Sequence, residues 1–380
     1  MAWNRLLSGV GFSFLAVLSV RSAEWPAGSS FTIPAGTAVT NAAAQVPLAC
    51  FTNNGALTFL PGADVTLTGS GVTAIGSGTG AAGVFECLGG RLLHQGSGYF
   101  VVGHAGATGT MTIAAGAEVQ LSHSSNRFCI ARNEEGWRNL PARGDVSVAG
   151  LLSANYLEMT GYFPTNLAPP YALSATLTLE DGGVVETGLI AKNDCARSEI
   201  RFSGGTLRTL QNTSSLFAGR GIVDLVIADG TAAVFDTNGK SVVLATGAPP
   251  EDTHVCLRGQ TNETATGDGG LVKTGEGALV VRLLPSHNTF TGAVTVLAGS
   301  LDLGRPLAEH QRVTVAAGAN FAVQAPSDIA KITYLGQAED RMVYTVAADT
   351  GSLDLTALNT LFYDDRLAGP RSGTVTLSNA

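Results

Sequence analysis

Carboxylate side chains are the residues of this sequence best suited to chemistry. Two carboxylates flanking a sugar linkage catalyse glycoside hydrolysis, and clustered carboxylates bind Ca²⁺. Adjacent acids stand in polar stretches typical of loops, so we interpret them as solvated surface. A second group consists of three aspartates, two of which stand at turn or strand-end positions, and this argues against a metal site. The adjacent acids are Glu134 with Glu135, Glu180 with Asp181 and Asp364 with Asp365, and the aspartates are Asp224, Asp229 and Asp236.

Other residue types that bind metals or act as nucleophiles are scattered. No two histidines stand at metal-ligand spacing, and no Gly-x-Ser-x-Gly elbow, HExxH motif or P-loop occurs. The cysteines are odd in number and far apart, which excludes zinc and CxxC patterns and leaves their pairing open; we expect most to be small core residues. The sequence therefore predicts no catalytic, cofactor-binding or metal-binding residue. The residues considered are His94, His104, His123, His254, His287, His310, Cys50, Cys87, Cys129, Cys195 and Cys256.

Two recognition features remain in the polar stretch before residue 160. The tripeptide Arg143, Gly144 and Asp145 is an RGD sequence, expected in a loop. Trp137, Arg138, Arg143 and Tyr156 combine aromatic and basic side chains suited to stacking on sugars, although an ordinary loop is the simpler interpretation.

The elements that must position these residues are short strands. A pattern of apolar-x-apolar-x-x-Gly-x-x-apolar-x-apolar recurs along the chain. Apolar residues two apart share one face of a strand, and the glycine suits a turn between two strands. The copies are Leu57, Phe59, Gly62, Val65, Leu67; Met111, Ile113, Gly116, Val119, Leu121; Leu177, Leu179, Gly182, Val185, Thr187; Leu225, Ile227, Gly230, Ala233, Phe235; and Val313, Val315, Gly318, Phe321, Val323.

Successive units of this repeat must stack on one another, because each unit has a single apolar face that it cannot bury alone. Strands that enter each turn with the same polarity pair in parallel. We therefore expect an all-β chain folded as a right-handed parallel β-helix, with irregular loops between its coils. A β-sandwich is the structural alternative, but Asn-Gly hairpin signals occur only at Asn54 and Asn238. Residues 357–367 form the one weak helical pattern after the first twenty residues.

Composition agrees with many short strands and tight turns. Of 380 residues, 48 are glycine and only 14% are charged, while 45% are hydrophobic, which argues against disorder. The net charge of −8 without a basic block argues against a nucleic-acid partner.

The first 23 residues have the order of a secretory signal peptide. A positive residue, Arg5, precedes an apolar run over residues 6–20, and the small residues Ser22 and Ala23 follow. The run is too short for a membrane anchor and contains Gly9 and Gly11. We expect cleavage near Ser22 or Ala23, and no later helix long and apolar enough to cross a membrane.

Three spaced motifs lie within residues 269–303, namely GGLVKTGEGAL at 269–279, NTFTG at 288–292 and VTVLAGSL at 294–301. They are similar to the GGLxKxGxGxL opening, the NxYTG segment and the TxVxAGxL close of the autotransporter-associated β-strand repeat. The resemblance implies a passenger-type β-helix on the outside of a Gram-negative or related bacterium. Residues 282–285 depart from the usual short turn, and we expect no translocator barrel before Ala380.

These observations predict four parts: a signal peptide (1–23), β-helix coils (24–268), the resembling repeat (269–303) and further strands (304–380). The predicted function is an exported structural or adhesive protein at the cell surface or outer membrane, presenting loops to polysaccharides or other cell-surface components. The alternative is an extracellular polysaccharide lyase or hydrolase. A polygalacturonase-like order of NTD, DD, GH and RIK motifs is absent, since Gly103 with His104 precedes the only DD.

Overall fold

The computed structural model describes ten stretches of the chain. The predicted signal peptide and the weak helical pattern lie outside them, as do Glu134, Glu135, Trp137, Arg138, Cys195, His254, Asp364 and Asp365. The described residues are 25–42, 47–133, 140–161, 173–192, 197–219, 223–245, 255–260, 269–335, 343–346 and 374–377.

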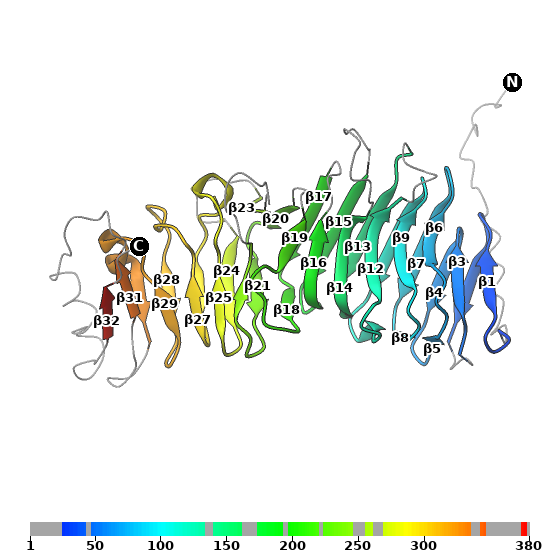
Figure 1. The fold of residues 1–380 in the computed structure, drawn as a ribbon, viewed down its shortest axis with the longest axis horizontal. Coiled ribbons are helices and arrows are strands. Elements are labelled where there is room, and N and C mark those ends of the chain that lie inside the picture. The colour runs from blue at the N-terminus through cyan, green and yellow to red at the C-terminus, as the bar shows by residue number, and fades with distance from the viewer. Residues whose placement is uncertain are drawn as a thin grey trace, which may run out of the picture.

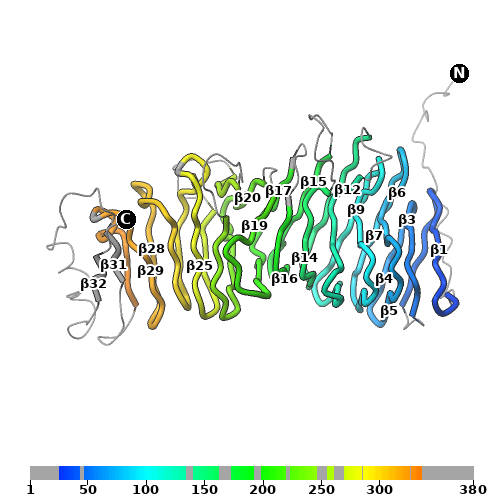
Figure 2. The backbone as a smooth tube through the Cα atoms, in the orientation of Figure 1, coloured from blue at the N-terminus to red at the C-terminus, as the bar shows by residue number. Residues whose placement is uncertain are grey.

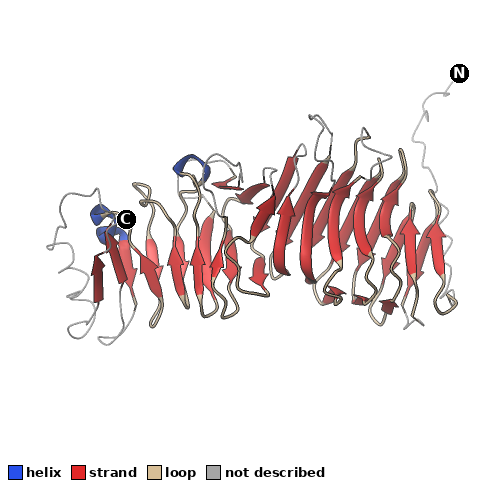
Figure 3. Ribbon diagram, in the orientation of Figure 1, coloured by secondary structure: helices blue, strands red, loops and turns tan. Residues whose placement is uncertain are grey.

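The strands form a long stack in which the chain passes three sides in turn, so that each coil lies on the one before it. Figure 1 shows the stack running from β1 at one end to β32 at the other, and Figure 2 shows the chain winding around it. We call the three parallel ladders of strands on these sides ladders 1, 2 and 3. Strands dominate throughout (Figure 3).

Ladder 1 is a nine-stranded parallel sheet. Its strands, in order, are β2 (Ala38–Asn41), β4 (Ala56–Phe59), β7 (Ala82–Cys87), β10 (Thr108–Ile113), β13 (Arg143–Val148), β15 (Ser174–Glu180), β17 (Arg197–Ser203), β20 (Val223–Ile227) and β23 (Val255–Gly259).

Ladder 2 extends further towards the C-terminal end. It contains β5 (Asp64–Leu67), β8 (Gly90–His94), β11 (Ala117–Leu121), the first parts of β14 (Leu151–Gly161) and β16 (Val184–Lys192), β18 (Thr206–Thr209), β21 (Ala232–Asp236), β24 (Gly270–Thr274), β26 (Val294–Val296), β28 (Val313–Val315) and β30 (Ile332–Tyr334).

Ladder 3 uses the second parts of β14 and β16, which bend from one side to the next. Its other strands are β1 (Ser30–Ile33), β3 (Cys50–Asn53), β6 (Thr73–Ser77), β9 (Tyr99–His104), β12 (Arg127–Arg132) and β19 (Phe217–Gly219). A four-stranded sheet continues the same side, with β22 (Val242–Val243), β25 (Ala278–Val280), β27 (Ser300–Asp302) and β29 (Asn320–Ala322).

The last coils replace ladder 1 by less regular backbone. Two 3-10 helices, η2 (Pro285–His287) and η3 (Pro326–Lys331), follow β25 and β29 where a ladder 1 strand would otherwise come. Leu257 of β23 bridges to Asn288, directly after η2. The final strands β31 (Val343–Val346) and β32 (Thr374–Leu377) pair with each other in parallel.

The prediction of an all-β parallel β-helix is confirmed. Every apolar position of the five template copies is buried in one core that runs along the stack. The template glycines mark the corners between ladders, and all five have positive φ, a conformation that costs glycine little. They are Gly62, Gly116, Gly182, Gly230 and Gly318.

Coil length varies, as the irregular glycine spacing predicts. Arg208 stands in register with Glu186, 22 residues earlier, whereas Ser147 stands in register with Thr178, 31 residues later. Both pairs join neighbouring strands of one ladder, so the extra residues leave the pairing intact.

Candidate ligand-binding surface

The three aspartates of the acidic group do not meet. Asp224 lies on ladder 1, where Arg258 donates to it at 3.3 Å, and Asp236 lies on ladder 2, where Arg208 donates to it at 2.7 Å. Asp229 is exposed in the turn between β20 and β21. Among the described residues, no three His, Cys, Asp or Glu side chains are arranged to hold a metal ion.

The described pair of adjacent acids is part of the scaffold. Glu180 ends β15 and accepts a hydrogen bond from Ser147 of β13 at 2.8 Å, while Asp181 is exposed in the following turn. This contact links the outer faces of two neighbouring coils. The two carboxylates of the pair therefore belong to different local environments, a strand end and a corner.

The expectation that the RGD tripeptide lies in a loop is wrong. Arg143 and Asp145 point outwards from β13, and Gly144 between them is buried. The Arg143 guanidinium donates to both carboxylate oxygens of Asp145, with Nε–Oδ2 at 2.6 Å and Nη2–Oδ1 at 3.3 Å. Strand alternation explains the placement: outward polar residues alternate with inward small and apolar ones.

An aromatic and basic surface does form, but on ladder 3. Tyr99 of β9, Arg127 of β12 and Tyr156 of β14 occupy equivalent outward positions in three successive coils. The Arg127 guanidinium lies 4.5 Å from the centre of the Tyr156 ring and 5.8 Å from that of Tyr99. Tyr156 was predicted from sequence as part of such a patch; Arg143 instead belongs to ladder 1. We call Tyr99, Arg127, Arg132, Tyr156 and Glu158 the tyrosine–arginine site.

A buried carboxylate supports this site. The Glu158 side chain is 1% exposed, and its Oε2 lies 2.9 Å from Nη1 of Arg132 and 4.0 Å from Nη1 of Arg127. The Cys129 thiol donates to the same oxygen at 3.1 Å. Burial, followed by the nearby Glu158 charge, raises the pKa of Cys129 well above its usual range, so the thiol remains protonated and unsuited to nucleophilic attack.

The position of Arg132 depends on a local break in strand geometry. Ala131 has a φ of 56°, and Gly103 and Thr160 adopt positive φ at the corresponding places of β9 and β14. A residue with positive φ interrupts the alternation of the strand, so the next side chain takes the other face. Arg132 thereby turns outwards and covers the Tyr99 ring, with its guanidinium carbon 4.2 Å from the ring centre.

Sequence reasoning missed four of the five residues of this site. One signal was available: residues 99–104 (YFVVGH) and 127–132 (RFCIAR) share the same order of aromatic or basic, apolar, small and basic positions. Aligned in successive coils, they place Tyr99 beside Arg127 and His104 beside Arg132. The alignment of Tyr156 and Glu158 with them required knowledge of the coil length.

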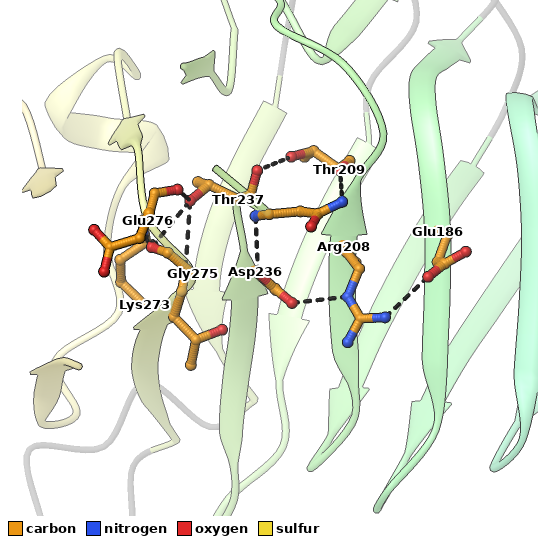
Figure 4. A network of polar contacts seen from close by, with 10 residues as sticks. Glu186, Arg208, Thr209, Asp236, Thr237, Lys273, Gly275 and Glu276 are labelled. Atoms are coloured by element: carbon orange, nitrogen blue, oxygen red, sulfur yellow. Dashed lines mark hydrogen bonds and ion pairs between the residues drawn. The ribbon is translucent and has the colours of Figure 1, made fainter. Parts of the chain in front are cut away.

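A second polar network spans ladder 2 and the predicted repeat (Figure 4). Arg208 binds Asp236 at 2.7 Å and Glu186 at 2.9 Å, which ties three successive coils together. Further along, the fully buried Lys273 ammonium donates to the carbonyl oxygens of Thr274, Gly275 and Ala298 at 2.8, 2.7 and 3.0 Å.

The surroundings of Lys273 indicate a structural role. Burial lowers the pKa of Lys273 to about 8, and the charges of Asp236 and Glu276 act in the opposite direction. All three ammonium hydrogens are used on backbone carbonyls of two coils, so this lysine secures a corner and its amine is not presented to a ligand.

Comparisons with protein-family models, curated proteins and solved structures found no match to this chain. Within the described residues, no helix has the length and apolar character needed to cross a membrane.

Proposed function

We propose that this chain is an exported β-helix that binds polysaccharide at the cell surface and has no catalytic role. The stack supplies a long, regular scaffold on which outward side chains repeat at strand spacing. The resemblance of residues 269–303 to the passenger-type repeat, together with the predicted signal peptide, supports export to the extracellular or outer-membrane surface of a Gram-negative-type bacterium.

The tyrosine–arginine site is the observation that carries the binding role. Tyrosine rings stack on the apolar faces of sugars while their hydroxyls remain available for hydrogen bonds. Tyr99 and Tyr156 stand two coils apart on one face, about 9–10 Å at ordinary strand spacing, and both are half-buried. This spacing suits contacts to alternate sugars of a chain lying along the stack.

The charged groups of the described surface favour binding over catalysis. Asp224 and Asp236 are each bound to an arginine, on different ladders, so they do not flank one groove as a pair of catalytic carboxylates would. Glu158 is buried beneath the surface it supports. Binding to glycans or to other cell-surface components needs only the exposed faces.

The test measures both retention and cleavage. The purified chain is applied to a panel of immobilised bacterial and plant polysaccharides, and the release of new reducing ends is followed in parallel. We expect retention without release. Tyr156→Ala should weaken retention about fivefold, because it removes roughly 1 kcal/mol of stacking, whereas Thr178→Ala, on the outer face of ladder 1, should not.

New chain ends that disappear when Asp224, Asp229 and Asp236 are replaced would instead establish a lyase or hydrolase. Absence of retention on every polymer would leave a spacer or stalk as the description of the molecule.

A further inference from the structure

We infer that the tyrosine–arginine site selects anionic polysaccharides, those whose sugars carry carboxylate or sulfate groups. This inference rests on the polysaccharide-binding role proposed above and specifies its ligand. It follows from the charges of the site, the exposure of its two arginines and the way in which Arg127 is held.

The charges within the site do not cancel. Two guanidinium groups, of Arg127 and Arg132, face the one carboxylate of Glu158, and both approach the same oxygen, Oε2. The Cys129 thiol beside them stays protonated, because burial and Glu158 raise its pKa. One positive charge therefore remains uncompensated within this group, on a chain whose net charge is −8.

Exposure assigns that charge to Arg127. Arg132 is 16% exposed and makes the close contact with Glu158 at 2.9 Å. Arg127 is 31% exposed, and its nearest Glu158 oxygen lies at 4.0 Å, the limit for an ion pair. No hydrogen bond to the Arg127 guanidinium is found among the described residues, so its N–H groups can serve a ligand in the fork geometry that matches carboxylate and sulfate.

The tyrosines hold Arg127 ready for such a ligand. The Arg127 guanidinium carbon lies 4.5 Å from the centre of the Tyr156 ring and 5.8 Å from that of Tyr99, and these contacts hold the side chain without using its hydrogen-bond donors. A side chain that is already ordered loses less entropy on binding. A sugar bound beside the two half-buried tyrosines would place its acidic group next to Arg127.

Paired polymers test the inference. Isothermal titration calorimetry compares polygalacturonate with the same polymer after carboxyl reduction, and dextran sulfate with dextran. We expect the anionic member of at least one pair to bind tenfold or more tightly, and its affinity to fall with added salt. Arg127→Gln should reduce that affinity about tenfold or more, since it removes a charge-assisted contact. Preference for only one anionic polymer identifies the acidic group recognised.

The matched control is Arg258→Gln, which removes an outward arginine of similar exposure from ladder 1 and should leave binding unchanged. Thermal unfolding verifies that each variant is folded, and Arg127→Lys, which keeps the charge but loses the fork, should lie between wild type and Arg127→Gln. Equal binding of charged and neutral polymers, or anionic binding that folded Arg127→Gln or Arg127→Lys leaves unchanged, would overturn the inference while the proposed function stands. Failure of the wild type to bind any polymer would remove both.

Discussion

His94 is a histidine placed where neighbouring coils have leucine. In the register of ladder 2 it lies between Leu67 and Leu121, and its side chain is fully buried. Burial lowers the pKa of His94 to about 4, with smaller opposing and reinforcing effects from the Gly69 backbone and His123. The native state therefore keeps the imidazole neutral at a pH where an unfolded chain would already bind a proton.

This shift predicts an acid sensitivity of stability. The pKa of His94 in the folded protein lies below the ordinary value of about 6.5. Above pH 6.5 the histidine is neutral in both the folded and the unfolded chain, so the protein has its full stability. As the pH falls towards 4, only the unfolded chain binds the proton, and the free energy of unfolding decreases by up to about 3 kcal/mol. We expect His94→Leu to flatten the difference in free energy of unfolding between pH 7 and pH 4.5, measured by urea denaturation. His310→Gln, at an exposed site, is the control and should keep the wild-type difference. An unchanged difference in His94→Leu would contradict the assignment.

At the scale of the strand and its corner, Gly116 occupies a turn that requires a positive φ but leaves space for a side chain. Its φ is 78°, and apart from the two adjacent residues no atom lies within 4 Å of the place where a Cβ would stand. A substitution here therefore meets backbone strain alone. We expect Gly116→Ala to lower the free energy of unfolding by about 1 kcal/mol. Glu118→Ala, on the outer face of the next strand, should change it by less than about 0.5 kcal/mol. A neutral Gly116→Ala would show that the corner relaxes.

Sequence predicted these elements because their chemistry is local. Alternating apolar positions and a turn glycine specify a strand, a corner and a second strand, and the structure buries them as expected. The RGD tripeptide was predicted to lie in a loop because its residues are polar, although their alternation of outward and inward positions is that of a strand. Tyr99, Arg127 and Glu158 were missed for another reason: their proximity depends on the register between coils, which follows from coil lengths that no local pattern determines.

At the scale of the whole molecule, each coil contacts chiefly its neighbours, so damage should remain local. Phe128 stacks on Phe100 with ring centres 5.4 Å apart in the core between two coils. We expect Phe128→Ala to cost about 3–5 kcal/mol locally and to speed hydrogen exchange in β9, β12 and β14. Exchange in β26, β28 and β30 should stay at the wild-type rate. Uniform acceleration along the chain, measured by mass spectrometry, would indicate one cooperative unit instead.

The unequal coil lengths have a consequence for how the sequence of such a molecule can evolve. Ser147 and Thr178 stand in register across 31 residues, and Glu186 and Arg208 across 22, with the same parallel pairing. A corner therefore tolerates gains and losses of sequence that a strand does not. Duplication of a coil would lengthen the scaffold, and insertion at a corner would diversify its surface. Neither event would require the core to be repacked.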